Sequence, residues 1–205
     1  MVKLEMEQKW DERLRINTAG RDDVNADEYR YPYEPTPYAV LQRLADAGFI
    51  GQEDVVLDYG CGKGRVDFFL SRRTGARTIG VEYDEHIYCS ALENQKTADA
   101  VEKTAFVWTR AETYEVPRDV NRCYFFNPFS AEILHKAMAR ILESYYDSPR
   151  EVLLFFYYPS DEYVAYLMTV EELDFEDEID CRDLFDGNDG RERILIFSLP
   201  PLEVA

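Results

Sequence analysis

The chain has 205 residues, of which 46% are hydrophobic and 14% aromatic, a composition typical of one globular domain rather than of a disordered segment. Its 41 Asp and Glu residues outnumber its 23 Lys and Arg residues, and the formal net charge is −18. This charge argues against nucleic acids and anionic membranes as partners, because both repel an acidic surface.

Cysteine spacing argues against disulfide and zinc chemistry. Cys61, Cys89, Cys123 and Cys181 lie far apart and form no CxxC pair, and the sequence has only two histidines, so we expect reduced thiols and no metal. The first 18 residues are charged throughout, unlike a signal peptide, and no apolar run approaches the ~20 residues of a membrane span. We therefore expect a cytoplasmic protein without a membrane segment; its oligomeric state stays open.

The N-terminal quarter of the chain predicts two helices with a loop between them. Residues 3–16 predict a charged helix, residues 19–35 a polar, tyrosine-rich loop, and the segment after Thr36-Pro37 a helix that ends at Gly48. Thr36 is the expected N-cap, because threonine followed by proline is a common helix start. We expect a single compact domain in which residues 1–35 form an N-terminal helix and a lid-like loop, and residues 36–205 form the main domain.

Strands and helices then alternate along the chain. Apolar runs and helical periodicity predict, in order, strand Val55–Asp58, helix Arg65–Arg73, strand Thr78–Glu82, helix Glu85–Lys96 capped by Asp84, strand Ala105–Thr109, strand Cys123–Asn127, helix Ala131–Tyr145 and strand Glu151–Tyr158. Strands near Phe175–Cys181 and Arg191–Phe197, with the turn-rich stretch Gly187–Gly190 and no helix between them, predict an antiparallel hairpin. Together these elements predict an α/β fold with a mostly parallel sheet and a hairpin edge.

The glycine-rich stretch DYGCGKG ends the first of these strands. Gly60, Gly62 and Gly64 permit a tight turn and let a ligand approach the backbone, at the edge where parallel sheets bind ligands. A phosphate-binding P-loop does not fit, because Lys63 is followed by glycine and not by Ser or Thr. The dinucleotide pattern GxGxxG fits less well, because the third glycine comes one residue early.

Asp58 and the three glycines match the pattern Asp/Glu-x-Gly-x-Gly-x-Gly at every specified position. On this stretch the chain resembles the class I, seven-stranded S-adenosylmethionine-dependent methyltransferases, over roughly residues 31–197. The resemblance implies a Rossmann-like fold with a mostly parallel seven-stranded sheet, a C-terminal antiparallel hairpin and helices on both faces. It also implies S-adenosylmethionine as the cofactor and residues 36–205 as the methyltransferase domain.

The resemblance extends to the ends of the next two strands. Glu82 is expected to accept the ribose hydroxyls, because a carboxylate matches a vicinal diol, and Tyr83 is expected to lie against the adenine ring. After the third strand, Ala111-Glu112 resembles a variant of the family's adenine-binding segment, with Ala111 supplying backbone and Glu112 a side-chain acceptor. The common Gly-Asp form is absent, so a solvent-exposed role for Glu112 stays open.

The fourth strand ends in Asn127-Pro128-Phe129. This stretch resembles, with one proline missing, the Asp/Asn-Pro-Pro-Phe/Tyr motif of amino-group methyltransferases that act on adenine N6 or glutamine. The resemblance implies that the Asn127 oxygen and the Pro128 carbonyl accept hydrogen bonds from the target amine, and that Phe129 forms a pocket wall. Alternatively, Asn-Pro only ends the strand, and Phe129 packs under a helix capped by Ser130.

Two aromatic segments border the same region. Tyr33 and Thr36 lie in a stretch that resembles a Tyr-x-Pro-Thr segment of some seven-stranded protein-lysine methyltransferases, which implies contact with the methionine end of the cofactor. Tyr157 and Tyr158, with Asp161, follow the fifth strand, where ordinary packing is favoured over an aromatic enclosure for an ammonium group. The two histidines, His86 and His135, are expected on the surface.

These observations predict an enzyme that transfers a methyl group from S-adenosylmethionine to a nitrogen atom. An acidic protein favours a cationic or neutral acceptor, namely a protein lysine, another amine or a small molecule. Two alternatives stay open: an RNA or DNA base N-methyltransferase, which Asn127-Pro128-Phe129 favours and the charge opposes, and a non-catalytic S-adenosylmethionine-binding subunit. A dinucleotide-dependent dehydrogenase is a third class, which the glycine spacing disfavours.

Overall fold

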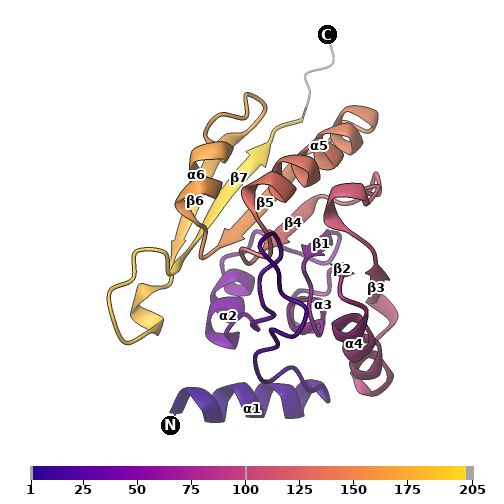
Figure 1. Ribbon diagram of the computed structural model, residues 1–205, viewed down its shortest axis with the longest axis vertical. Coiled ribbons are helices and arrows are strands. Elements are labelled where there is room, and N and C mark those ends of the chain that lie inside the picture. The colour runs from indigo at the N-terminus through magenta and orange to yellow at the C-terminus, as the bar shows by residue number, and fades with distance from the viewer. Residues whose placement is uncertain (1, 100, 202–205) are drawn as a thin grey trace.

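The computed structural model describes residues 2–99 and 101–201 and contains one seven-stranded sheet (Figure 1). The strand order is β3-β2-β1-β4-β5-β7-β6. Strands β1 to β5 pair in parallel, whereas β7 is antiparallel to both β5 and β6. The strands are β1 Val55–Tyr59, β2 Arg77–Glu82, β3 Thr104–Trp108, β4 Arg122–Phe125, β5 Val152–Tyr157, β6 Asp174–Asp180 and β7 Arg193–Leu199.

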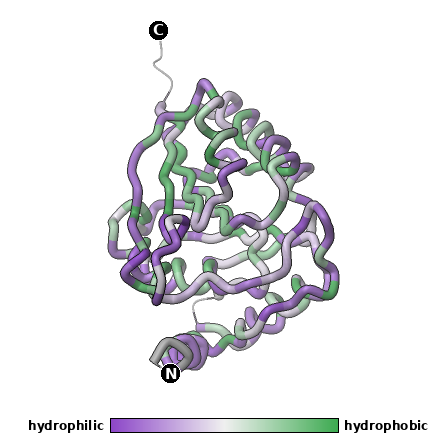
Figure 2. The backbone as a smooth tube through the Cα atoms, turned by 60° about the vertical axis from the view of Figure 1, so that its left-hand side comes forward, coloured by the Kyte–Doolittle hydropathy of each residue, from purple (hydrophilic) through white to green (hydrophobic). Residues whose placement is uncertain are grey.

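Helices cover both faces of the sheet and create two apolar cores. One core contains buried side chains of α5 and α6 packed on the strands, and the other contains those of α2 and α3 together with Ala91 of α4. The helix α1 crosses the bottom of the molecule in Figure 1 and is mostly hydrophilic in Figure 2. The helices are α1 Val2–Leu14, α2 Tyr38–Asp46, α3 Arg65–Thr74, α4 Glu85–Thr97, α5 Ala131–Asp147 and α6 Asp161–Leu167, with short 3-10 helices at Val101–Lys103, Ala111–Thr113 and Arg182–Leu184.

The predicted α/β fold, with its mostly parallel seven-stranded sheet and C-terminal antiparallel hairpin, is confirmed. The strand β5 is buried along its whole length, as its unbroken apolar run indicated. The N-caps Asp84 and Ser130 accept hydrogen bonds from backbone N–H groups of α4 and α5. Within the described residues no helix has the length and apolar character needed to cross a membrane.

Two local predictions were wrong. Thr36 does not cap a helix, because Pro37 holds the N-cap position of α2. No N-cap side chain accepts a hydrogen bond from the first turn of this helix. The carboxylate of Glu7 on α1 instead accepts the Tyr38 N–H at 3.0 Å, so a distant helix supplies the partner. The short helix α6 was not predicted, although Ser160 caps it by accepting from the Tyr163 N–H.

The strand order brings the carboxyl ends of β1, β2, β4 and β5 to one edge. The chain runs from β1 outward to β3 and then crosses back to place β4 on the other side of β1. This crossing is a topological switch point, where the loops after β1 and β4 separate and leave room for a ligand. The antiparallel β7 begins where β5 ends, because Tyr157 pairs with Ile194. Residues just before β7 therefore lie at the same edge.

Arg65, in the first turn of α3, attaches the N-terminal segment to this edge. Its side chain is only 4% exposed and forms ion pairs with Glu7 and with Asp11, the latter at 3.7 Å. The Arg65 Nε also donates to the Thr18 hydroxyl at 2.7 Å, and that hydroxyl donates to Asp11 at 2.7 Å. One buried cation thus balances two carboxylates of α1 and holds the start of the loop that follows it.

We predict that Arg65→Met lowers the free energy of unfolding by about 3–5 kcal/mol, because removing one partner leaves buried carboxylates without a counter-charge. Arg73→Met on the same helix is the control, since its ion pair with Asp46 is exposed and is worth under ~1 kcal/mol. Urea unfolding of both variants measures the difference. Equal, small losses in the two variants would contradict the anchoring role of Arg65.

Candidate active site

A cavity of about 550 Å³ opens at the carboxyl edge of the sheet. Its walls come from the ends of β1, β2, β4 and β5, from the segment after β3, and from the loop 21–37. All but two of the residues predicted to bind the cofactor or the target amine line it: Tyr33, Thr36, Asp58, Gly60, Glu82, Tyr83, Ala111, Glu112, Asn127, Pro128 and Phe129. The exceptions are Gly62 and Gly64 of the same glycine turn, and Asp161 also lies outside the lining.

The glycine turn fastens the end of β1 to the end of β2. The N–H groups of Gly60 and Cys61 both donate to the Val81 carbonyl, at 2.9 and 3.1 Å. Gly60 and Gly62 have φ values of +74° and +57°, a backbone region that other residues rarely adopt. A Cβ atom at Gly60 would meet the Pro128 side chain at 2.5 Å, and one at Gly62 would collide with the Tyr33 ring. Both glycines are therefore required by close packing as well as by φ.

Glu82 is held rigidly at the end of β2. Its carboxylate is 5% exposed and accepts from the backbone N–H groups of Gly62 at 3.0 Å and of Tyr83 and Asp84 at 2.9 Å. Burial raises the pKa of Glu82, and these N–H groups oppose that rise. A carboxylate offers about four acceptor positions, so one position on Oε2 stays open toward a further donor.

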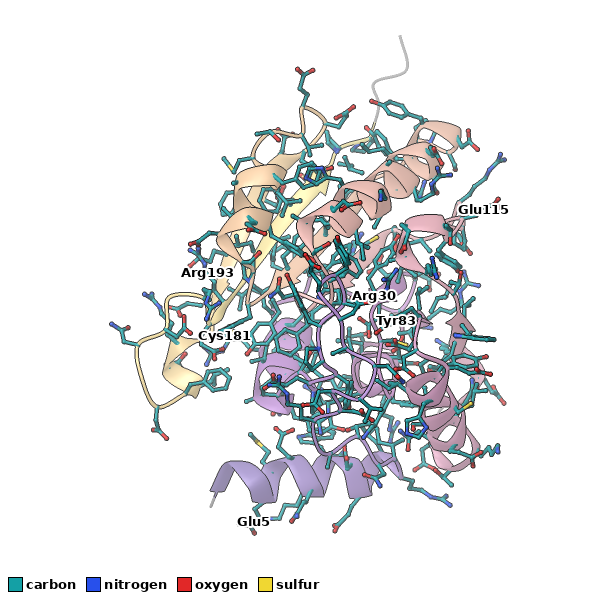
Figure 3. The ribbon with its side chains drawn as sticks, in the orientation of Figure 1. Glu5, Arg30, Tyr83, Glu115, Cys181 and Arg193 are labelled. Atoms are coloured by element: carbon teal, nitrogen blue, oxygen red, sulfur yellow. The ribbon has the colours of Figure 1, made fainter. Side chains whose placement is uncertain are left out.

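Arg30 lies between Tyr83 and Glu112, the two side chains predicted to contact adenine. Its guanidinium donates to Glu112 at 2.8 Å, and both side chains are 16% exposed. The same guanidinium lies 4.8 Å from the centre of the Tyr83 ring, beside which Figure 3 shows it. Glu112 is therefore half-buried and paired rather than solvent-exposed. One face of the Tyr83 ring is covered by a cation from the loop 19–35.

Asn127 occupies a strained position just beyond β4. Its φ is +42°, which asparagine tolerates better than most residues. Its Oδ1 is buried and has no hydrogen-bond partner among the described residues. A buried carbonyl oxygen without a partner costs free energy unless a ligand or water donates to it. The structure therefore places an unused acceptor in the wall of the cavity.

The next two residues are already engaged with the protein. The Pro128 carbonyl accepts the Tyr31 N–H at 3.2 Å, which leaves it one lone pair. Phe129 is 5% exposed, and its ring packs edge-on against Tyr59 and Phe125. The Phe129 carbonyl accepts the Tyr163 hydroxyl at 2.6 Å. Phe129 is thus a fixed wall of the cavity and also part of the apolar core.

The loop 19–35 docks directly on this segment. Arg30 and Phe129 form an isolated antiparallel bridge, and the Ser130 N–H donates to the Tyr29 carbonyl at 2.7 Å. The Tyr33 hydroxyl donates to the Thr18 carbonyl at 2.7 Å, and the Thr36 hydroxyl lies 3.2 Å from that of Tyr124. Both hydroxyls predicted to contact a cofactor therefore bond within the protein while their side chains line the cavity.

Asp58 and Asp67 form a fully buried pair of carboxyl groups behind the glycine turn. Burial raises the pKa of Asp58 to about 7, and the neighbouring Asp67 carboxyl partly offsets this rise. Burial, reinforced by the negative charge of Asp58, raises the pKa of Asp67 well above its usual range. Asp67 therefore keeps its proton at neutral pH. Neither of its carboxyl oxygens has a hydrogen-bond partner among the described residues.

Sequence reasoning missed several charged residues that line the cavity, among them Arg30, Arg65 and Glu192. Arg65 follows the glycine turn directly, so a cation at the start of α3 was a usable signal. Arg30 and Glu192 carried none, because the chain brings them to the cavity from a loop and from the β6–β7 connection. Among the residues the structure describes, no group of three His, Cys, Asp or Glu side chains is arranged to hold a metal ion.

Known proteins with the same architecture carry out methyl transfer. An RNA methyltransferase from Salinibacter ruber, solved with S-adenosyl-L-homocysteine, matches with a TM-score of 0.58 and 18% identity over 84% of this chain and 97% of that one. A human methyltransferase 10 domain-containing protein matches with a TM-score of 0.60 and 14% identity over 97% and 96%. At these identities the likeness establishes the fold, which is that of the class I S-adenosylmethionine-dependent methyltransferases.

A curated relative adds a sequence match. The chain is 34% identical over 64 residues to a protein-lysine N-methyltransferase of Saccharolobus islandicus, a match over 31% of this chain. The match spans 40% of that relative, well under its full length. No protein-family model matches the chain.

We predict that the Asp58–Asp67 pair makes stability fall as pH rises. Unfolded aspartates titrate near pH ~3.9, whereas the folded pair holds extra protons up to pH about 7. Between these values the native state binds more protons, so the pair's contribution to the free energy of unfolding decreases with pH. Asp67→Asn removes the proton that Asp67 holds, and with it the part of this slope that comes from Asp67.

Urea unfolding between pH 4.5 and 7.5 measures the effect as a difference between variant and wild type. The difference should shift in favour of Asp67→Asn as pH rises. The exposed loop substitution Asp186→Asn should run parallel to the wild type. A constant difference between Asp67→Asn and the wild type over this range would show that Asp67 holds no extra proton.

Proposed function

We propose that the protein is an S-adenosylmethionine-dependent methyltransferase that methylates an amino nitrogen, with a protein lysine side chain or another amine as the acceptor. The fold, the cavity at the switch point and the lysine-methyltransferase relative support this function. The observation that carries it is the buried, partnerless Oδ1 of Asn127 in the cavity wall. This oxygen is suited to accept a hydrogen bond from an N–H group of a target amine.

The residues present fit the methyl donor. The bare backbone at Gly60 borders the cavity, and the open position on the Glu82 carboxylate suits a ribose hydroxyl. In the proposal Tyr83, Ala111 and Glu112 border the adenine, and Tyr33 and Thr36 border the methionine end. The donor, when bound, supplies an activated methyl group that passes to the nitrogen lone pair as the carbon–sulfur bond breaks, leaving a neutral thioether.

The protein's contribution is alignment and exclusion of water. Asn127 accepts a hydrogen bond from one N–H of the amine and so directs the nitrogen lone pair toward the methyl group. Holding the two reacting atoms in this orientation accelerates the transfer. Phe129, fixed against Tyr59, bounds the amine on one side. An amine that arrives protonated first releases a proton to water, since attack needs a free lone pair.

A nucleic-acid base is the second candidate acceptor. Asn127-Pro128-Phe129 and the architecture shared with an RNA methyltransferase favour it. The net charge of −18 opposes it, because phosphate backbones are repelled. Every arginine in the cavity wall is also paired with a carboxylate, as shown by Arg21, Arg30 and Arg65. Amines of proteins and small molecules therefore rank first.

The proposal is tested with radiolabelled S-adenosylmethionine, lysine-rich peptides and a structured RNA. We expect label in the peptides, and Asn127→Gly should reduce the rate by about 100-fold through lost alignment. Glycine is used because it tolerates the positive φ, and Asn188→Gly in the exposed hairpin loop is the control. Transfer to RNA alone would select the second candidate. Donor binding without transfer to either acceptor would indicate a non-catalytic binding subunit.

Glu82 should control donor affinity. Glu82→Ala removes a charge-assisted acceptor and should weaken S-adenosylhomocysteine binding by about 1.5–3 kcal/mol in titration calorimetry. Glu82→Gln keeps an oxygen for the backbone N–H groups and separates loss of affinity from loss of stability. Glu85→Ala, on the exposed first turn of α4, is the matched control. Unchanged affinity in Glu82→Ala would remove Glu82 from the donor site.

A further inference from the structure

The cavity also has an aromatic wall made of residues that are not assigned to the donor. Phe126 follows β4, Tyr157 ends β5 and Tyr158 comes directly after it. The Phe126 and Tyr157 rings lie 4.7 Å apart, and the Tyr158 ring meets Phe126 edge-on at 6.5 Å. Glu192, just before β7, completes this wall because antiparallel β7 starts where β5 ends. Figure 3 marks its neighbour Arg193 toward the hairpin, away from Arg30 and Tyr83.

The Glu192 carboxylate is fixed in place by one of these rings. The Tyr157 hydroxyl donates to Glu192 Oε2 at 2.7 Å. The Glu192 backbone is fixed as well, since its carbonyl accepts the Cys181 N–H at 2.9 Å and its N–H donates to the Asp189 carbonyl at 3.1 Å. A carboxylate that uses one acceptor position on a tyrosine retains the others for a second donor.

Glu192 is also a negative charge without a cation. Each arginine of the cavity wall forms an ion pair with a carboxylate: Arg21 with Glu34, Arg30 with Glu112, and Arg65 with Glu7. Within the described part of the chain, no lysine, arginine or histidine forms an ion pair with Glu192. A partly buried, uncompensated carboxylate favours a ligand that brings positive charge.

Two residues beside this aromatic wall have a strained backbone conformation. Tyr158 has a φ of +51° and Asn127 one of +42°, at the ends of the neighbouring strands β5 and β4. Such conformations cost free energy and persist where the surrounding packing holds them, commonly at binding sites. Asn127, whose buried Oδ1 lacks a partner, is among the residues that line the same cavity. Two acceptors and a group of rings therefore converge.

The aromatic group already holds one cation on its outer side. The Arg191 guanidinium, which does not line the cavity, lies 4.3 Å from the centre of the Tyr158 ring. It is also 3.4 Å from Asp189 and donates to the Tyr158 hydroxyl at 2.6 Å. In this protein an aromatic ring beside a carboxylate, Tyr158 beside Asp189, thus binds a cation. The cavity wall has the same combination, with Tyr157 beside Glu192.

We propose that Glu192 is the counter-charge that positions a protonated primary amine in the acceptor site, with the aliphatic stem of the amine against the rings of Phe126 and Tyr157. Glu192 stays ionised and acts as a positioning residue, and the proton released before transfer goes to water. The proposal rests on the proposed function and narrows it to acceptors that carry an ammonium group, of which a lysine side chain is one.

The test uses n-butylammonium, which has the length of a lysine side chain, and n-butanol as its neutral counterpart. Binding of each is followed by NMR titration with S-adenosylhomocysteine present. The wild type should bind butylammonium at least about tenfold more tightly than butanol, the size of one charge-assisted contact. Glu192→Gln, which keeps an acceptor for Tyr157, should abolish that preference and leave butanol affinity unchanged.

Two further variants make the result specific. Glu192→Asp keeps the charge and should retain part of the preference. Asp186→Asn removes the same charge from the same loop outside the cavity and should retain all of it. In the methyl-transfer assay Glu192→Gln should raise KM for the amine about tenfold with a smaller change in kcat.

The outcomes separate this inference from the proposed function. Absence of S-adenosylhomocysteine binding by the wild type would overturn the function itself. Normal binding of S-adenosylhomocysteine with no preference for butylammonium would overturn only the role of Glu192. A preference that survives in folded Glu192→Gln would do the same.

Discussion

The close approach of two segments to the glycine turn is the constraint on which the site depends. The Pro128 side chain reaches the Cα of Gly60, and the Tyr33 ring covers Gly62. Any side chain at either glycine would push away the loop after β4 or the loop 19–35. These two loops also bond to each other, through the Tyr31 N–H and the Pro128 carbonyl. The glycine turn, the loop after β4 and the loop 19–35 therefore form one packed unit.

Predictions from the sequence were most accurate where local patterns decide structure. Buried strands such as β5 appear as apolar runs, and Asp84 and Ser130 cap helices with their own first turns. The glycine pattern correctly indicated the fold and the edge that carries the cavity. Thr36 failed as a cap because Glu7, on a helix that packs from elsewhere, accepts the first N–H of α2. Tertiary contacts of this kind leave no local signal.

The charged residues of the cavity were likewise predictable only where a local sequence pattern places them. Glu82 was predictable because its place follows from a strand end and its spacing from Asp58. Its three backbone N–H donors were not, since they depend on how the glycine turn folds back toward it. Arg30 reaches Glu112 across 82 positions of sequence. Pairing at such separations follows from the assembled sheet and loops, and one sequence alone does not specify it.

The pairing pattern also fits the proposal that both the donor and the acceptor are cationic. The arginines of the wall are used internally, by Glu112 among others, so they do not repel a sulfonium or an ammonium group. The Asp58–Asp67 pair keeps a proton, which limits the negative charge behind the turn. Among the acceptors that stay available are one open position on Glu82, the Asn127 oxygen and the Glu192 carboxylate. Acceptors without a paired cation along one cavity are the feature that the proposed donor and amine require.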